Sequence, residues 1–175
     1  MITFKNSDLK LSGKKPTHIV IHHTNELSPT TNVDTGKFEL SNLQKRIYSF
    51  QRKNKYGYHV IIERIQSDYY PVVCQPWFTE CHWEDLDKDF DTCMHIAFLG
   101  NFDMDMLMDR AYRVLAFQLL VPLCRYFRIT QDRIVLHKEI SKDKKITCPG
   151  EFFDRTRMEE YYHAYYKRGP SISRN

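Results

Sequence analysis

Residues 17–23 read T-H-I-V-I-H-H, a short apolar run that ends in two histidines. β-Branched residues dominate the run, and Gly13 and Pro16 precede it, which is the pattern of a strand bounded by a turn. Side chains alternate between the two faces of a strand, so His22 and His23 are expected to point in opposite directions. The stretch therefore predicts a β-strand that delivers an imidazole at its carboxyl end.

Further elements follow along the chain. Apolar residues at helical spacing predict a helix over 38–53 and a longer one over 106–127, with a bend at Pro122. The acidic stretch 75–92 has no period and is expected to be a long loop of functional importance. The other predicted elements are strands at 58–65, 69–74, 94–99 and 134–136 and a closing helix at 152–167.

Strands interspersed with helices predict an α/β fold with a single mixed central sheet flanked by helices. No repeat or linker divides the chain, so residues 1–168 are expected to form one domain, followed by a disordered tail at 169–175. In the strand at 58–65, alternation predicts one face with Tyr58, Val60 and Ile62 and another with His59, Ile61 and Glu63.

The composition limits the possible functions. A hydrophobic share of 42% and a charged share of 27% are those of an ordinary globular protein rather than a disordered one. The net charge of +4 gives mild attraction to anionic polymers, bacterial wall polymers among them, but Glu139 and Asp143 interrupt the basic run at 138–145, so no nucleic-acid binding is expected.

The same residues bear on location. No stretch has the length of a membrane span and the first residues lack an apolar signal region, so we expect no membrane association and a cytoplasmic chain. Five cysteines, an odd count at irregular spacing, suit reduced thiols.

Three residues with metal-binding side chains lie at the ends of predicted elements. His22 and His23 close the first strand, His137 closes the later strand that begins at 134, and Cys148 precedes Pro149. Imidazole and thiolate both bind Zn²⁺, and three protein ligands leave a fourth position for water, as in catalytic sites. From the residues alone, the alternative is a set of ordinary histidines and an inert buried thiol.

Four blocks of sequence extend this pattern. They are I-V-I-H-H-T (19–24), G-Y-H-V-I-I-E (57–63), H-I-A-F-L-G-N-F (95–102) and I-V-L-H-K-E with T-C-P-G (134–150). Together they resemble the type 2 N-acetylmuramoyl-L-alanine amidases, a family that includes phage lysozyme-amidases and peptidoglycan recognition proteins. The blocks stand in the family's order and span residues 17 to about 155.

The resemblance implies roles for individual residues. His22, His137 and Cys148 match the zinc ligands, and Tyr58 matches the tyrosine that assists catalysis in the phage members. Zinc would lower the pKa of its bound water and polarise the scissile carbonyl. Tyr58 would then hydrogen-bond the developing oxyanion or position the water. A packing role is the alternative for this tyrosine.

One position departs from the family pattern. Many catalytic relatives carry Lys or Thr two residues before the metal-binding Cys or Asp, but this chain has Ile146 there, flanked by Lys145 and Thr147. Either flanking residue is a candidate for the missing stabilising group. Loss of such a donor typically slows an enzyme by about 100–1000-fold.

Three further residues are candidates for the substrate groove. His82 falls where relatives often have a Gly-x-His that lines the groove, and Trp83 and His23 complete the set. For His23 the alternative is support of the neighbouring metal ligand His22 or a structural role. His59 and His95 are expected to be buried histidines with satisfied hydrogen bonds.

The resemblance implies hydrolysis of the N-acetylmuramoyl-L-alanine amide bond, with peptidoglycan or muropeptides as the partner. We expect a monomer that reaches the cell wall after release on lysis, as a phage endolysin does, or one that recycles muropeptides. The alternatives are a non-catalytic peptidoglycan-binding protein and a protein-binding regulator on the same fold. Retention of all three zinc ligands and of Tyr58 favours the enzyme.

Overall fold

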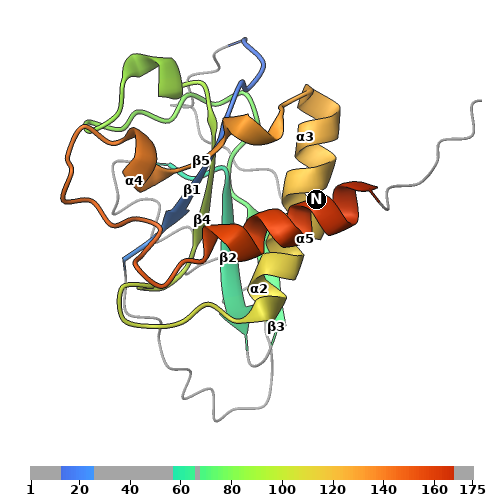
Figure 1. Ribbon diagram of the computed structural model, residues 1–175. Coiled ribbons are helices and arrows are strands. Elements are labelled where there is room, and N and C mark those ends of the chain that lie inside the picture. The colour runs from blue at the N-terminus through green and yellow to red at the C-terminus, as the bar shows by residue number, and fades with distance from the viewer. Residues whose placement is uncertain (1–12, 26–56, 66–67, 168–175) are drawn as a thin grey trace, which may run out of the picture.

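The computed structural model describes residues 13–25, 57–65 and 68–167. Its centre is a five-stranded sheet in the order β3-β2-β4-β1-β5 (Figure 1). The strands are β1 (Ile19–His23), β2 (Val60–Ile65), β3 (Asp68–Val73), β4 (Met94–Phe98) and β5 (Ile134–Leu136). The predicted strands are confirmed, whereas the predicted helix at 38–53 and the tail at 169–175 lie outside the described residues.

The sheet is mixed, as predicted. β1 pairs in parallel with β4 and β5, β4 pairs in parallel with β2, and β3 runs antiparallel to β2. The carboxyl ends of β1, β4 and β5 therefore lie at one edge of the sheet. In open α/β sheets this edge is where ligands bind.

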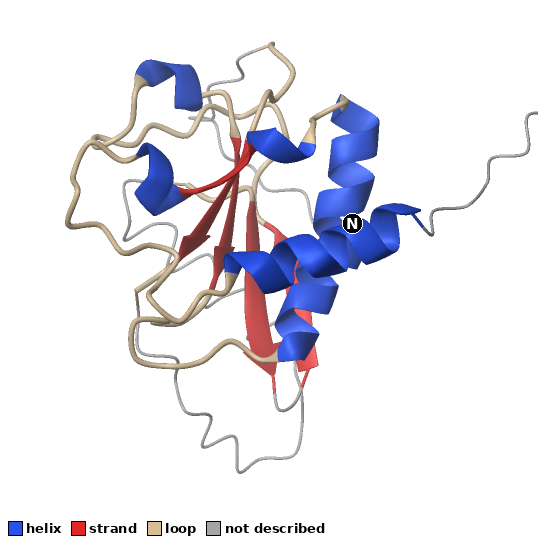
Figure 2. Cartoon of the chain, viewed as in Figure 1, coloured by secondary structure: helices blue, strands red, loops and turns tan. Residues whose placement is uncertain are grey.

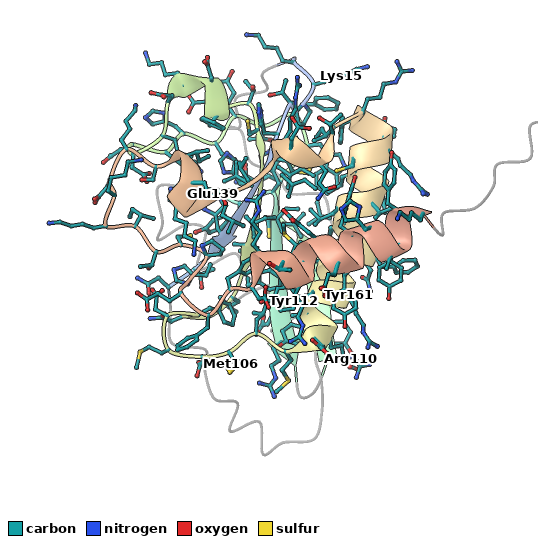
Figure 3. All side chains as sticks on the ribbon, viewed as in Figure 1. Lys15, Met106, Arg110, Tyr112, Glu139 and Tyr161 are labelled. Atoms are coloured by element: carbon teal, nitrogen blue, oxygen red, sulfur yellow. The ribbon has the colours of Figure 1, made fainter. Side chains whose placement is uncertain are left out.

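Helices cover one face of the sheet. They are α2 (Asp109–Val114), the π-helical segment η2 (Leu115–Leu120), α3 (Val121–Phe127) and α5 (Arg155–Lys167). Figure 2 shows them on one side of the strands, with loops and short helices on the other. Tyr112 and Tyr161 lie where α2 and α5 meet (Figure 3). The buried core between sheet and helices includes Ile19, Ile21, Val60, Ile62, Ile96, Phe98, Tyr112, Leu115, Leu120 and Met158.

The long predicted helix is present but interrupted. It begins at Asp109 rather than at residue 106, because Met108 is extended with φ −74° and ψ 153°. The irregular segment η2 directly precedes α3, whose second residue is Pro122. The proline ring lacks an N–H and crowds the preceding turn. No helix in the described part of the chain is long and apolar enough to cross a membrane.

The opposite face of the sheet packs against the loop at 75–92. Ile61 and Ala97 of the sheet contact a cluster that contains Tyr58 and Trp83. The prediction that Tyr58 shares a face with Val60 and Ile62 is wrong, because β2 begins only at Val60 and the chain bends at His59. The alternation of a strand does not extend through such a bend.

The sequence did not predict the short helix α4 (His137–Ile140), which follows β5 without a loop. His137 is therefore the first residue of a helix rather than the last residue of a strand. Glu139, labelled on α4 in Figure 3, accepts the Leu136 N–H at 2.8 Å and pairs with Arg155 of α5. These bonds tie α4 to both β5 and α5.

Candidate metal centre

Three side chains from separate segments meet near the carboxyl end of β1. His22 lies in β1, His137 begins α4, and Cys148 lies in the loop between α4 and α5. One nitrogen or sulfur atom from each lies within 4.8 Å of the corresponding atoms of the other two. All three residues are buried. The structure thus brings together the three residues selected from the sequence.

The ring of His137 is oriented by a carboxylate. Its Nε2 lies 2.8 Å from Asp85 Oδ2, and the Ser141 hydroxyl donates to the same oxygen at 2.6 Å. A carboxylate only accepts, so Nε2 of the neutral ring carries the proton and Nδ1 carries the lone pair. Nδ1 is buried and has no hydrogen-bond partner among the described residues.

His22 is enclosed by rings. Its Nδ1 lies 3.8 Å from Cys148 Sγ, and its Nε2 lies 2.9 Å from His95 Nδ1. Trp83 stacks on the imidazole, with ring centroids 4.4 Å apart and planes inclined by 16°. Burial lowers the pKa of His22 well below its usual value, and the nearby His137 lowers it further. The ring is therefore neutral, which is the form that binds metals.

The loop that carries Cys148 is fixed by backbone bonds. Lys138 N–H donates to the Cys148 carbonyl at 2.8 Å, and His23 N–H points at Sγ over 3.3 Å. On either side of the cysteine, Asp103 accepts the Thr147 hydroxyl and the Glu151 N–H, each at 2.8 Å. The thiol therefore has a set position beside His22.

This arrangement fits a zinc ion. Two neutral imidazoles and a thiolate form a common zinc donor set. Burial raises the pKa of the Cys148 thiol to about 12, so a thiolate at this position has to be stabilised by a nearby cation. Buried polar atoms are rarely left without a partner, and a metal ion would satisfy His137 Nδ1.

Gly150 makes a close approach that only glycine allows, and we expect Gly150→Ala to destabilise the fold by at least about 2 kcal/mol. Its φ is +115°, and a Cβ would stand 2.5 Å from the carbonyl oxygen of Phe102. Thermal denaturation measures the effect. Gly13→Ala is the matched control, because Gly13 has φ +65° with nothing within 4 Å of its Cβ position. Equal losses in the two variants would contradict a constraint by Phe102.

Tyr58 and Trp83 lie directly beside the cluster. The Tyr58 ring meets the His22 ring edge-on at 5.4 Å, and its hydroxyl donates to the His23 carbonyl over 3.5 Å. Trp83 is 7% exposed and packs on His22, so its location suits support of this candidate metal ligand. Contact of Trp83 with substrate stays a prediction.

The two residues that flank Ile146 differ in their surroundings. Thr147 donates its hydroxyl proton to Asp103. Lys145 is exposed, and its backbone N–H donates to Asp143 Oδ1 at 2.9 Å. Neither side chain is among the three that meet in the cluster.

The remaining groove candidates, His82 and His23, differ in exposure and in their partners. His82 has 64% of its side chain exposed, with Nδ1 3.2 Å from Asp91. His23 is 5% exposed, and its Nδ1 accepts the Phe102 N–H at 3.2 Å. The structure therefore gives His23 the contacts of its structural alternative and leaves His82 accessible.

Two residues that contact the imidazole rings of the candidate metal ligands were not identified from the sequence. They are Asp85, which contacts His137, and His95, which contacts His22. Asp85 lies in the aperiodic loop at 75–92, where no pattern indicates which side chains point inward. His95 was expected only to be buried, which it is. The register Val20↔His95 and His22↔Ala97 places it diagonally across from His22 on the same sheet face. The strand order, which the sequence does not specify, was the missing information.

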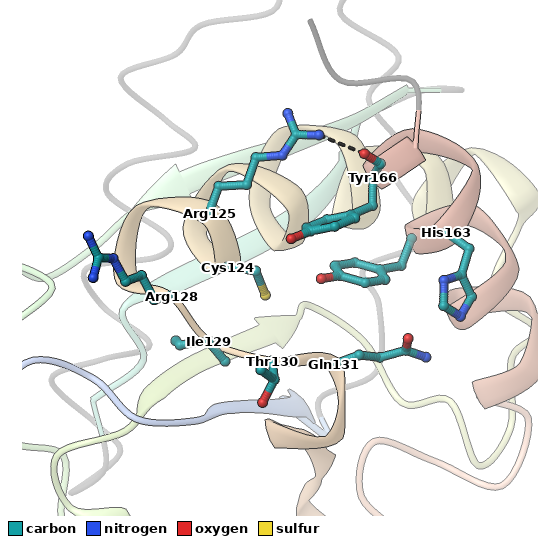
Figure 4. Close-up of a pocket in the computed structure, with 9 residues that line it drawn as sticks. Cys124, Arg125, Arg128, Ile129, Thr130, Gln131, His163 and Tyr166 are labelled. Atoms are coloured by element: carbon teal, nitrogen blue, oxygen red, sulfur yellow. Dashed lines mark hydrogen bonds between the residues drawn. The ribbon is translucent and has the colours of Figure 1, made fainter. Parts of the chain in front are cut away.

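A separate cavity of about 530 Å³ lies between α3 and α5 (Figure 4). Cys124, Arg125, Tyr162 and Tyr166 are among its lining residues, and Arg125 donates to the Tyr166 carbonyl at 2.7 Å. It shares no residue with the histidine and cysteine cluster. The chemistry of the donor set therefore locates the candidate site at the cluster.

Comparison with known proteins gives a family match. The family model described as N-acetylmuramoyl-L-alanine amidase matches residues 12–151. A search of curated protein sequences finds no significant match.

Solved structures share the fold. The N-acetylmuramoyl-L-alanine amidase LysC from Clostridium intestinale has a TM-score of 0.61 at 18% identity, over 85% of this chain and 86% of that chain. Drosophila peptidoglycan recognition protein SD has 0.62 at 20%, over 85% and 82%. The Ph2119 endolysin from the Thermus scotoductus bacteriophage Ph2119 has 0.59 at 21%, over 88% and 89%. Such similarities establish the fold.

Proposed function

Because the chain belongs to the N-acetylmuramoyl-L-alanine amidase family, we propose that it hydrolyses the amide bond between N-acetylmuramic acid and L-alanine in peptidoglycan with the help of zinc. The observation that carries the proposal is the convergence of His22, His137 and Cys148 in one buried cluster. Release of stem peptides from purified peptidoglycan tests it.

Zinc in this position would be held by His22 Nδ1, His137 Nδ1 and Cys148 Sγ. A bound zinc ion lowers the pKa of water and polarises a carbonyl group, which yields a nucleophile at neutral pH. The protein's own part is to hold both imidazoles neutral and in the right orientation. Burial lowers the pKa of both rings and so keeps them neutral. Asp85 orients His137, and Trp83 restrains the plane of His22.

Tyr58 is the proposed oxyanion donor. Its hydroxyl bond to the His23 carbonyl is 3.5 Å long, which is at the weak limit for a hydrogen bond. The hydroxyl can therefore exchange this partner for the carbonyl oxygen of a substrate. The ring contacts with His22 and Trp83 hold the side chain in place meanwhile.

Of the two residues beside Ile146, Lys145 is the better candidate for a substrate contact. Thr147 has a single hydroxyl proton and donates it to Asp103, a bond that also fixes the Cys148 loop. Lys145 is exposed in the same loop. A cation there would stabilise a developing oxyanion or a carboxylate of the stem peptide.

The proposed partner is peptidoglycan or a soluble muropeptide. His82 is the accessible member of the predicted groove set, and the net charge of +4 favours approach to anionic wall polymers. We propose that the chain acts as a monomer and reaches the wall after release on lysis.

The second candidate function is recognition of peptidoglycan without cleavage. Ile146 at the position of a catalytic Lys or Thr favours it, as does the similarity to Drosophila peptidoglycan recognition protein SD. Zinc binding without release of stem peptides, on walls of several chemotypes, would support recognition or a regulatory role.

Asp85→Asn tests the metal ligand His137. The amide can donate to Nε2 and so favour the wrong tautomer, and loss of such a partner lowers metal affinity by about 10–100-fold. Zinc affinity, measured by competition with a chelator, should fall by this factor. Asp91→Asn is the matched control, since Asp91 lies in the same loop and contacts the exposed His82. An unchanged affinity in Asp85→Asn would contradict His137 as a ligand.

A further inference from the structure

A second histidine contacts His22 from the neighbouring strand of the sheet. His95 lies in β4, the strand next to β1 (Figure 1), and is fully buried at 0% exposure. Its Nδ1 lies 2.9 Å from His22 Nε2, and its Nε2 lies 3.1 Å from the Phe90 carbonyl oxygen. The three groups form a continuous hydrogen-bonded chain inside the protein.

The Phe90 carbonyl oxygen at the end of this series of hydrogen bonds determines which nitrogen carries each proton. A carbonyl only accepts, so His95 Nε2 carries a proton and donates it to Phe90. A neutral imidazole has one N–H, which leaves the lone pair of His95 on Nδ1. His22 Nε2 must then donate to His95 Nδ1, which leaves the lone pair of His22 on Nδ1, the atom beside Cys148 Sγ.

The other arrangements each bring two lone pairs together. If His22 carried its proton on Nδ1, two bare nitrogens would face each other across 2.9 Å. If His95 carried its proton on Nδ1, its bare Nε2 would face the Phe90 carbonyl across 3.1 Å. Buried acceptors without donors are costly. A doubly protonated His95 would be a fully buried charge whose two ring partners, His22 and the Phe90 carbonyl, are not anionic, so this form does not relieve the conflict.

The His95 ring is itself held in place. Trp83 stacks on it with ring centroids 5.5 Å apart and planes inclined by 22°, and the same indole stacks on His22. The backbone N–H of His95 donates to His59 Nδ1 at 3.1 Å. His59 is held in turn, because its Nε2 lies 3.0 Å from the Thr79 carbonyl oxygen. The pair of imidazoles therefore has little freedom to turn.

We propose that His95 is a positioning residue that locks His22 in the tautomer with a bare Nδ1, and so prepares it to bind a metal ion. The inference rests on the proposed zinc site for its purpose, but the tautomer itself is a property of the zinc-free protein. The two ligand histidines are then oriented by different partners, a neutral imidazole for His22 and the Asp85 carboxylate for His137.

Nitrogen chemical shifts of the imidazole rings in the zinc-free native protein test the tautomer. Protonated and bare ring nitrogens differ widely in shift, and we expect His22 and His95 each to carry the proton on Nε2. A proton on Nδ1 of His22 would overturn the proposal. Because this measurement needs neither zinc nor substrate, it separates failure of the proposal from failure of the amidase assignment.

Replacement of the acceptor gives the second test. His95→Leu should leave His22 with mixed tautomers and lower the zinc affinity by about 10–100-fold. His59→Leu is the matched control, because it removes another buried histidine that bonds His95 but is not hydrogen-bonded to His22. The His59→Leu variant should preserve the His22 tautomer and the zinc affinity. A His95→Leu variant with both properties unchanged would contradict the positioning role.

Discussion

Cys148→Ser is expected to lose most of its zinc and its hydrolytic activity. A neutral hydroxyl is a far poorer ligand than a thiolate, and it leaves only His22 and His137 to hold the ion. The substitution is otherwise small, since serine keeps the position of the thiol beside the His23 N–H. Zinc content after dialysis and release of stem peptides from peptidoglycan measure the two losses.

The control for this experiment is Cys124→Ser. Cys124 is also a buried free cysteine, at 2% exposure, but it lies in α3 and interacts with Tyr162 of α5. Its replacement should leave zinc content and activity near native. Full retention of zinc by Cys148→Ser would contradict the ligand assignment.

Tyr58→Phe is expected to slow hydrolysis by about 100–1000-fold while zinc content stays unchanged. The change removes one hydroxyl, and the ring can keep its contacts with His22 at 5.4 Å and Trp83 at 5.3 Å. A loss in kcat with an unchanged metal content would therefore report a group that acts in the transition state.

Tyr69→Phe is the matched control, because Tyr69 is a buried tyrosine at 7% exposure in the core on the helical face. It should keep the native rate. If Tyr58→Phe also kept the native rate, Tyr58 would have a packing role only.

The sequence predicted the strands well because each has a short apolar run between turn residues. The ends of two such runs, His22 and His137, were therefore identified as candidate ligands before the sheet order was known. Their meeting with Cys148 depends on parallel pairing of β1 and β5, which no local pattern specifies. The family resemblance supplied that long-range information.

The wrong prediction for Tyr58 and the omission of Asp85 and α4 share a cause. Tertiary contacts, rather than local periodicity, determine the structure of these segments. The bend at His59 places Tyr58 on the other side of the sheet. The backbone N–H of His59 donates to β4, and the His59 carbonyl accepts N–H groups from the chain after β3. Asp85 lies in a loop without period, and α4 has four residues, too few for a helical pattern. Both elements nevertheless orient a proposed zinc ligand.

The most direct test of a zinc amidase is to measure the zinc content of the purified native protein together with the release of stem peptides from purified peptidoglycan. Stoichiometric zinc and cleavage at the bond between N-acetylmuramic acid and L-alanine are the expected results. Absence of zinc from a folded protein, or zinc without cleavage on walls of several chemotypes, would contradict the assignment.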